Sequence, residues 1–270
     1  MPEIPEMEVY KKQLNETIRF KKIVDVEINR PQSINMEPEE FREKVIDELP
    51  VYIGRRGKHL VLTLGNGVYL VGHLMLGGRL YLAKPEEKLK TKGSIVFHFL
   101  DGKRLYFINF RLGWLHALDR EGMDEKLATL GIEPLDKEFS LEKFTSMLSE
   151  KKATIKSLLV DQQFIAGIGN CYSDEILFNA SIRPDRKADD LRVGEISSLY
   201  SAIPFTLKEA ILNGGYMDKP FAKDDKLTGG QNKLLKVYDR EGENCYLCSD
   251  KIEMTMISGK KSYFCPTCQK

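Results

Sequence analysis

The sequence has no apolar run long enough to cross a membrane, and its first residues are too acidic for a secretory signal peptide. We therefore expect a cytoplasmic protein that does not bind membranes. The chain also has no excess of either charge, because 41 basic and 40 acidic residues give a formal net charge of +1. Any binding to nucleic acid must then come from local basic patches rather than from the field of the whole molecule.

The length and the composition are those of a globular protein with a sizeable core. A chain of 270 residues suggests two domains rather than one. With 42% hydrophobic and 30% charged residues, it has the composition of an ordinary soluble protein.

The first half of the chain is rich in strand patterns. Helical spacing is confined to residues 5–18 and 41–49. Gly65-Asn66-Gly67 is a strong hairpin signal between two alternating segments. The predicted strands are residues 24–28, 60–64, 68–74, 79–83, 94–100 and 103–110. This half is expected to form a β-sandwich or barrel with the leading helix laid against it.

The pattern changes around Leu130 to Asp136, where Gly131 and Pro134 interrupt it, and helices follow. Residues 140–150, 152–162 and 192–212 have helical patterns, and Asn170 is placed as the N-cap of a further helix. The turn before Asn170 contains Gly167 and Gly169 and suits either phosphate binding by backbone N–H groups or an ordinary helix connection. Residues 214–232 are predicted to be a polar loop.

The amino end offers a candidate nucleophile. If Met1 is removed, Pro2 has a free secondary amine, which attacks an electrophilic carbon and forms an iminium. A terminal amine is also less basic than a lysine side chain, so more of it is neutral at pH 7. Glu3 and Glu6 lie at the start of the predicted helix, where carboxylates are favoured. The alternative is that Met-Pro is a common start and Pro5 merely opens a helix.

Arg55, Arg56 and Lys58 place three positive charges within four residues. They suit a solvated strand edge, where basic side chains discourage aggregation. They equally suit a site in which Lys58 stabilises a phosphate or a leaving group beside Pro2.

Four of the five cysteines form two C-x2-C pairs. Cys245 and Cys248 are separated from Cys265 and Cys268 by sixteen residues with hairpin character, which is the spacing of a four-thiolate zinc site. Disulfides are the alternative, and an expected cytoplasmic location argues against them. We expect one structural zinc ion, because all four ligand positions are filled. Cys171 is interpreted as a small packed residue.

Several of these segments together resemble the formamidopyrimidine-DNA glycosylase and endonuclease VIII family. The matching motifs are Met-Pro-Glu-Ile-Pro-Glu at residues 1–6, Gly-Arg-Arg-Gly-Lys-His at 54–59, His-Leu-Met-Leu-Gly-Gly-Arg at 73–79, Ala-Gly-Ile-Gly-Asn-Cys-Tyr-Ser-Asp-Glu at 166–175 and the terminal Cys-Pro-Thr-Cys-Gln. They occur in the family's order and extend over essentially the whole chain.

This resemblance implies an α+β multidomain protein. Its expected parts are an N-terminal catalytic β-sandwich domain with a leading helix at residues 1–131, a helix-two-turn-helix DNA-binding domain with a lesion-capping loop at 132–233, and a C-terminal zinc ribbon at 234–270. The implied partner is double-stranded DNA containing damaged bases or abasic sites. The implied protein is a monomer that is cytoplasmic and associated with the nucleoid.

The implied activity is that of a bifunctional DNA glycosylase and abasic-site lyase acting on oxidised bases. The damaged nucleotide is flipped out of the stack, and the Pro2 amine displaces the base at C1′ to give a Schiff base. The strand is then cleaved by β,δ-elimination. By resemblance, Glu3 is the acid that helps open the sugar ring, Lys58 is a proton donor and phosphate contact, and Glu6 and Glu175 orient the sugar and the amine.

The resemblance also assigns DNA contacts. Asn170, Arg111 and Lys156 are expected to hold phosphates, and Lys92 is the substitute for a histidine contact. Leu76, Phe110 and Leu112 align with the family's methionine, arginine and phenylalanine that fill the gap left by the flipped base. Phenylalanine cannot hydrogen-bond the orphaned cytosine, so weak selectivity for the opposite base is expected.

Lys260 replaces the ribbon arginine that the family uses in the second elimination. Lysine keeps the charge but loses the bidentate fork on phosphate. Two alternatives therefore accompany the main hypothesis. One is an enzyme that prefers oxidised pyrimidines over 8-oxoguanine. The other is a protein of the same fold that binds lesions or abasic sites with weak or no glycosylase activity.

Overall fold

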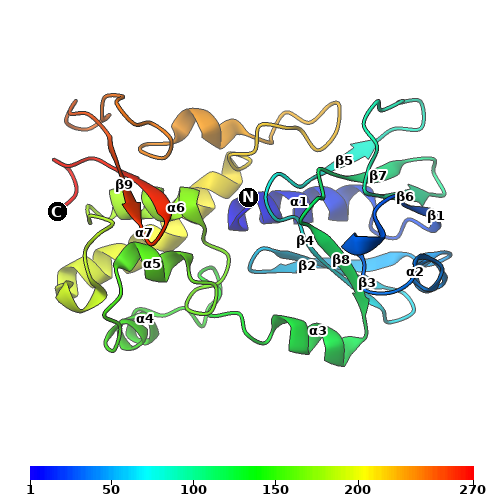
Figure 1. The fold of residues 1–270 in the computed structure, drawn as a ribbon, viewed down its shortest axis with the longest axis horizontal. Coiled ribbons are helices and arrows are strands. Elements are labelled where there is room, and N and C mark those ends of the chain that lie inside the picture. The colour runs from blue at the N-terminus through cyan, green and yellow to red at the C-terminus, as the bar shows by residue number, and fades with distance from the viewer. The chain divides into compact units, whose positions relative to one another are not determined.

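The computed structural model describes residues 1–270, and the chain divides into two compact units (Figure 1). The first consists of Met1–Thr129 and Asn213–Gly230. The second consists of Leu130–Leu212 and Gln231–Lys270. None of the helices in either unit is both long and apolar enough to span a membrane.

The first unit contains two four-stranded antiparallel sheets. Their strand orders are β2-β3-β4-β8 and β1-β6-β7-β5. The elements are α1 (Ile4–Thr17), β1 (Ile23–Ile28), the 3-10 turn η1 (Pro31–Ser33), α2 (Pro38–Val45), β2 (Pro50–Arg56), β3 (His59–Leu64), β4 (Tyr69–His73), β5 (Arg79–Ala83), β6 (Ile95–Phe99), β7 (Arg104–Ile108), β8 (Trp114–Leu118) and α3 (Arg120–Leu127).

Both sheets and the leading helix contribute to one apolar core. Tyr10 and Leu14 of α1 belong to the same buried cluster as Leu62 of β3 and Phe97 of β6. Apolar positions at helical spacing therefore fix α1 against the sheets, and this places the residues before Ile4 at a defined point on the first unit. The predicted β-sandwich with a leading helix is confirmed.

The strand predictions are confirmed for β1, β3, β4, β5, β6 and β7. Asn66 lies in the β3–β4 turn, and Gly67 has a φ of 86°, which glycine adopts without strain. In β1 a bulge between Ile23 and Asp25 shifts the register, so the buried residues are Ile23 and Val26 rather than Val24. β2, β8 and α3 were not predicted as elements. Gly54, Arg55 and Arg56 interrupt the apolar pattern of β2, and α3 consists mainly of charged residues.

The second unit contains helices and a two-stranded hairpin. Its elements are α4 (Leu141–Leu148), α5 (Ile155–Val160), α6 (Asn170–Asn179), the 3-10 turn η2 (Ala188–Asp190), α7 (Val193–Leu212), β9 (Glu253–Ile257) and β10 (Lys260–Phe264). A further 3-10 turn, η3 (Gly230–Leu234), begins at the last residue of the first unit. The predicted helices and the hairpin between the cysteine pairs are confirmed.

Two details of the second half differ from the sequence prediction. The N-cap of α6 is Gly169 rather than Asn170, which is the first helical residue. Residues 213–230 pack with the first unit, whereas the sequence placed residues 214–232 in the helical domain. Phe221 explains this grouping, because it joins the apolar core and its ring lies 5.9 Å from that of Tyr10. The exact limits of the three predicted domains stay a prediction.

Candidate functional site

A cavity of about 360 Å³ lies in the first unit beside the amino end of α1. It is lined by Met1, Pro2, Gly77, Gly78, Arg79, Asn109, Tyr216, Met217, Asp218 and Lys219. Pro2 is buried just before the helix start. The Met1 amine donates to the Tyr216 hydroxyl at 3.3 Å, and that hydroxyl donates to the Met1 carbonyl oxygen at 2.9 Å. The start of the chain and the loop containing Tyr216 therefore form two sides of one cavity.

Glu6 joins that loop to the helix. One carboxylate oxygen of Glu6 accepts from the Glu3 backbone N–H at 2.8 Å, as in a capping box, and the other accepts from the Tyr216 backbone N–H at 2.9 Å. Gly215 has a φ of 69°, and a Cβ there would lie 2.4 Å from Glu6 Oε1. Glu3 and Glu6 are both buried. The geometry supports a positioning role for Glu6.

Lys58 follows β2, an edge strand, and only 4% of its surface is exposed. Arg55 forms an ion pair with Glu8 at 2.8 Å. Burial of both residues does not fit the alternative of a solvated strand edge. Arg55 stabilises the contact between β2 and α1, whereas Lys58 lies in the turn that leads into β3.

Two of the three predicted wedge residues are exposed and the third is not. Leu76 is 64% exposed and Leu112 is 55% exposed. Phe110 is fully buried and its ring lies 5.2 Å from that of Phe107, so its side chain is not exposed for the predicted DNA contact, which stays a prediction. A Cβ at Gly113 would lie 2.2 Å from the Phe110 ring, so this glycine makes room for it. The apolar core takes up the phenylalanine that aligned with a DNA-contacting arginine.

The predicted phosphate contacts of the first unit, Lys92 and Arg111, are both exposed. A group of aromatic and histidine side chains lies on β3, β4 and β8 near Lys58, and sequence patterns gave no signal for it. Rings of His59 and His73 are 4.7 Å apart, and those of Trp114 and His116 are 4.5 Å apart. The Met75 backbone N–H donates to His73 Nδ1 at 3.0 Å, so His73 steadies the turn before Leu76.

Burial lowers the pKa of three histidines in this group. The pKa falls to about 4 for His59, to about 3 for His73 and to about 4 for His116. In each case burial disfavours the charged ring, and nearby positive charges act in the same direction. The group is therefore neutral at pH 7.

The expected contact of Lys156 with a phosphate stays a prediction. In this structure Lys156 is buried, with only 1% of its surface exposed. Its Nζ donates to Asp174 Oδ1 at 2.6 Å and to the Asn170 carbonyl oxygen at 2.9 Å. Burial raises the pKa of Asp174 to about 7, although Lys156 and the Tyr263 amide favour its charged form. Asp174 also accepts from Tyr263 N, so the pair ties α5 and α6 to β10.

Glu175 likewise has a structural role in this conformation. Its carboxylate accepts from the backbone N–H groups of Lys236, Val237 and Tyr238 at 2.8 to 2.9 Å. Burial raises the pKa of Glu175, and these three amides oppose that rise. Glu175 therefore anchors the chain that leads to the ribbon, and its expected role in orienting the sugar and the amine stays a prediction.

Asn170 lies at the start of α6, where the sequence predicted a phosphate contact. Its Nδ2 donates to the Lys261 carbonyl oxygen at 2.8 Å, and its Oδ1 is buried without a hydrogen-bond partner. Lys260, on the same hairpin as Lys261, is exposed.

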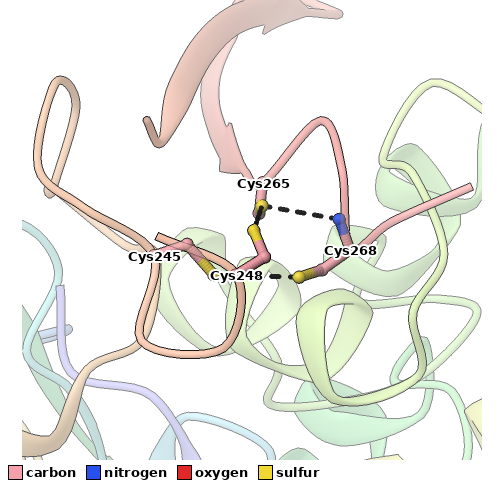
Figure 2. A group of neighbouring side chains, drawn as sticks. All are labelled: Cys245, Cys248, Cys265 and Cys268. Carbon is pink, nitrogen blue, oxygen red and sulfur yellow. Dashed lines mark hydrogen bonds between the residues drawn. The ribbon is translucent and has the colours of Figure 1, made fainter. Parts of the chain in front are cut away.

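The four paired cysteines converge from two turns of the chain (Figure 2). Their sulfurs all lie within 4.8 Å of one another, with Cys245 and Cys268 at 3.8 Å and Cys248 and Cys265 at 3.4 Å. Tetrahedral bonds of about 2.3 Å would separate the sulfurs by about 3.8 Å. No disulfide joins them, and Cys171 is buried apart from the group. The donor set can hold one metal ion.

Comparisons with known proteins give the same family for both units. The model of the formamidopyrimidine-DNA glycosylase N-terminal domain matches residues 1–113, and that of the H2TH domain of the same enzyme matches residues 130–219. A formamidopyrimidine-DNA glycosylase of Pelotomaculum thermopropionicum is 38% identical, with 100% of this chain and 99% of the relative covered. One of Shouchella clausii is 36% identical with the same coverage.

Solved structures of the Lactococcus lactis enzyme are also similar to this chain. Its complex with DNA containing an abasic site has a TM-score of 0.92 and 28% identity, covering 99% of both chains. Its complex with DNA containing an oxidised pyrimidine has a TM-score of 0.91 and covers 100% of both chains at 28% identity.

Proposed function

This chain belongs to the formamidopyrimidine-DNA glycosylase family, and on that premise we propose that it excises oxidised bases from DNA and cleaves the strand at the resulting abasic site. The observation that carries the proposal is the cavity beside Pro2. A residue with a secondary amine, once exposed by removal of Met1, lies at the wall of a cavity that two glycines and a loop leave open.

The proposed chemistry begins when the Pro2 amine attacks C1′ of the flipped nucleotide. The bond from C1′ to the base breaks, the base leaves with the electron pair, and it takes up the proton that the Pro2 nitrogen loses. Glu3 protonates the ring oxygen as the sugar opens, which gives an iminium between Pro2 and C1′. Loss of a proton from C2′ then expels the 3′ phosphate, and a second elimination expels the 5′ phosphate. Lys58 and Lys260 are the proposed proton donors in these steps.

Binding would use both units. Lys92 and Arg111 of the first unit, with Asn170 and Lys260 of the second, are the proposed phosphate contacts. Such contacts fix the register on DNA without reading its sequence. Leu76 and Leu112 are the proposed wedge that fills the gap in the stack. The protein would act as a monomer, because the nucleophile and the DNA contacts belong to one chain.

We propose zinc as the ion held by Cys245, Cys248, Cys265 and Cys268. Four thiolates at tetrahedral spacing suit zinc and leave no position for a substrate. When bound, the ion supplies a crosslink between the two turns and no chemistry. The hairpin between them would then present Lys260 from a rigid element.

Borohydride trapping on an abasic duplex tests the proposal directly. Reduction of the iminium links the wild-type protein covalently to DNA, whereas a Pro2→Gly variant, which still has a terminal amine, is expected to be trapped far less. Mass spectrometry of the purified protein should find Met1 removed. Absence of an adduct from the wild type would support the alternative, a protein that binds lesions or abasic DNA without turnover.

A further inference from the structure

The side chains of Arg79 and Asn109 line the cavity beside Pro2 and make no hydrogen bond or ion pair within the protein. The other charged groups on the wall, Asp218 and Lys219, are 3.7 Å apart and pair with each other at the exposed rim. A guanidinium has five donors and no acceptor, so an occupant of the cavity must supply acceptors for it.

The backbone places these two side chains together. Arg79 is the first residue of β5 and pairs with Ile108, the last residue of β7, so Asn109 follows next to it. Asn109 has a φ of 53°, which turns the chain at the strand end. Before Arg79, a Cβ at Gly78 would lie 2.1 Å from the Leu74 carbonyl oxygen. The glycine turn therefore lets β5 begin at the cavity wall.

The volume of the cavity does not discriminate between a pyrimidine and a larger base. About 360 Å³ lies in the usual range of small-ligand pockets and exceeds what one pyrimidine fills. Selection must then come from polar groups. Enzymes that flip a nucleotide read it through hydrogen bonds to its Watson–Crick edge. Because Asp218 and Lys219 pair with each other, the unpaired side chains on the wall are a donor-only guanidinium and an amide that both donates and accepts.

We propose that Arg79 is a specificity-determining residue that selects bases with a carbonyl oxygen, rather than an amino group, at position 4 of the Watson–Crick edge. This inference rests on the proposed function and names the substrate class within it, the 4-oxo pyrimidine lesions. A carbonyl accepts from the guanidinium. An amino group opposite the guanidinium would place donors against donors, so neither group would be hydrogen-bonded. A site with buried polar groups left unpaired rejects the wrong base more strongly than a site that only loses apolar contact.

A matched pair of lesions tests the inference. Two duplexes are made identical except for 5-hydroxyuracil in one and 5-hydroxycytosine in the other, each opposite guanine. Single-turnover rates of base release are measured with the wild type and with Arg79→Met, which removes the donors but keeps a long side chain. The ratio of the 5-hydroxyuracil rate to the 5-hydroxycytosine rate should fall about tenfold to a hundredfold in the variant. Comparing ratios removes any intrinsic difference between the two leaving groups.

Cleavage of a ready-made abasic duplex separates base selection from other roles. No base is present there, so Arg79→Met should cleave it at the wild-type rate, and thermal unfolding should report an intact fold. Arg120→Met, which changes an exposed arginine of α3 that pairs with Asp124, should leave the lesion ratio unchanged.

Three results would overturn the assignment. An unchanged ratio in Arg79→Met would mean that Arg79 does not select the base. An equal loss on the abasic duplex would place Arg79 on a phosphate or in the fold. A wild type that cleaves abasic DNA but releases neither pyrimidine would contradict the substrate class. A wild type that forms no borohydride adduct on abasic DNA is a different result, because it refutes the proposed function itself.

Discussion

Gly215 combines two constraints at a single residue. Its φ of 69° is in the left-handed region, and its missing side chain leaves room for the Glu6 carboxylate. That carboxylate accepts from the next backbone amide, that of Tyr216, and so holds the loop at the cavity. Any side chain at this position would push the loop away from Glu6.

We expect Gly215→Ala to lower both the rate of base release and the stability of the protein, whereas a glycine replaced away from the cavity should lower the stability alone. The left-handed conformation costs an alanine roughly 1–2 kcal/mol, and the contact at 2.4 Å must displace either Glu6 or the loop. Gly67→Ala is the matched control, because its φ is 86° and a Cβ there would contact nothing within 4 Å. Both variants should unfold at lower temperature, and only Gly215→Ala should lower the single-turnover rate of base release. Equal rates in the two variants would contradict the role of this contact.

Two loops join one sheet at the same end of the neighbouring strands β4 and β8, and each loop has an exposed leucine. His73 ends β4 and Trp114 begins β8, and these residues pair directly. Leu76 follows the first and Leu112 precedes the second. Strand pairing therefore holds the ends of both loops in register. Because Phe110 is buried, the two exposed leucines are the apolar side chains of these loops that are available for the proposed wedge.

Leu76→Ala and Leu112→Ala should reduce base release from a matched duplex without changing stability. Each leucine is exposed in the free protein, so truncation costs little folding free energy, whereas on DNA it would lose about 1.5–3 kcal/mol of burial. The expected loss is about tenfold to a hundredfold on duplex DNA, and smaller when the lesion lies in an unpaired bubble. Leu100→Ala, at a position 72% exposed in the β6–β7 turn, should match the wild type on both substrates. Similar losses on duplex and bubble would rule out a wedge.

At the scale of the whole molecule, the half-buried histidines His59, His73 and His116 connect stability to pH. Their pKa values lie below the ordinary value of 6.5, so between that value and about 4 the unfolded chain binds protons that the folded chain excludes. The histidines therefore remove stability as the pH falls through this window and contribute nothing above it. Asp174, with its pKa raised to about 7, acts in the opposite direction over a similar range.

Comparing His116→Phe with the wild type isolates one member of the group. The free energy of unfolding of the variant, relative to the wild type, should be constant above pH 7 and should rise by about 1–2 kcal/mol between pH 6.5 and pH 4. The change is smaller than for a fully buried ring, because solvent screens the charge of the half-buried His116. Urea unfolding at each pH measures the difference. A difference independent of pH would mean that His116 is not kept neutral by the fold.

Metal removal should act on the second unit alone. We expect one zinc ion per chain, and its removal by a chelator should lower the unfolding temperature of that unit by on the order of 10 °C. Elemental analysis and calorimetry measure the two effects. Cys268→Ser should lose the ion, whereas Cys171→Ala, which changes the buried cysteine outside the group, should keep it. Full metal content in Cys268→Ser would refute the four-cysteine site.

The sequence alone determined the features that depend on local chemistry. The Asn66-Gly67 turn and the apolar spacing of α1 are encoded over a few residues, as is the close pairing within Cys245–Cys248 and Cys265–Cys268. Backbone dihedral preferences and side-chain periodicity suffice to predict them. The order of the motifs was likewise enough to predict the family.

Only the tertiary structure decided which polar groups remain available. Lys156 and Asp174 are 18 positions apart in the chain, and their pairing depends on how α5 packs on α6. Phe110 is buried because its ring packs beside that of Phe107 in the core, and Arg79 lines the cavity beside Pro2 because of the β5–β7 register. Burial and pairing arise from contacts between residues remote in sequence, whose free energies exist only once the chain has folded.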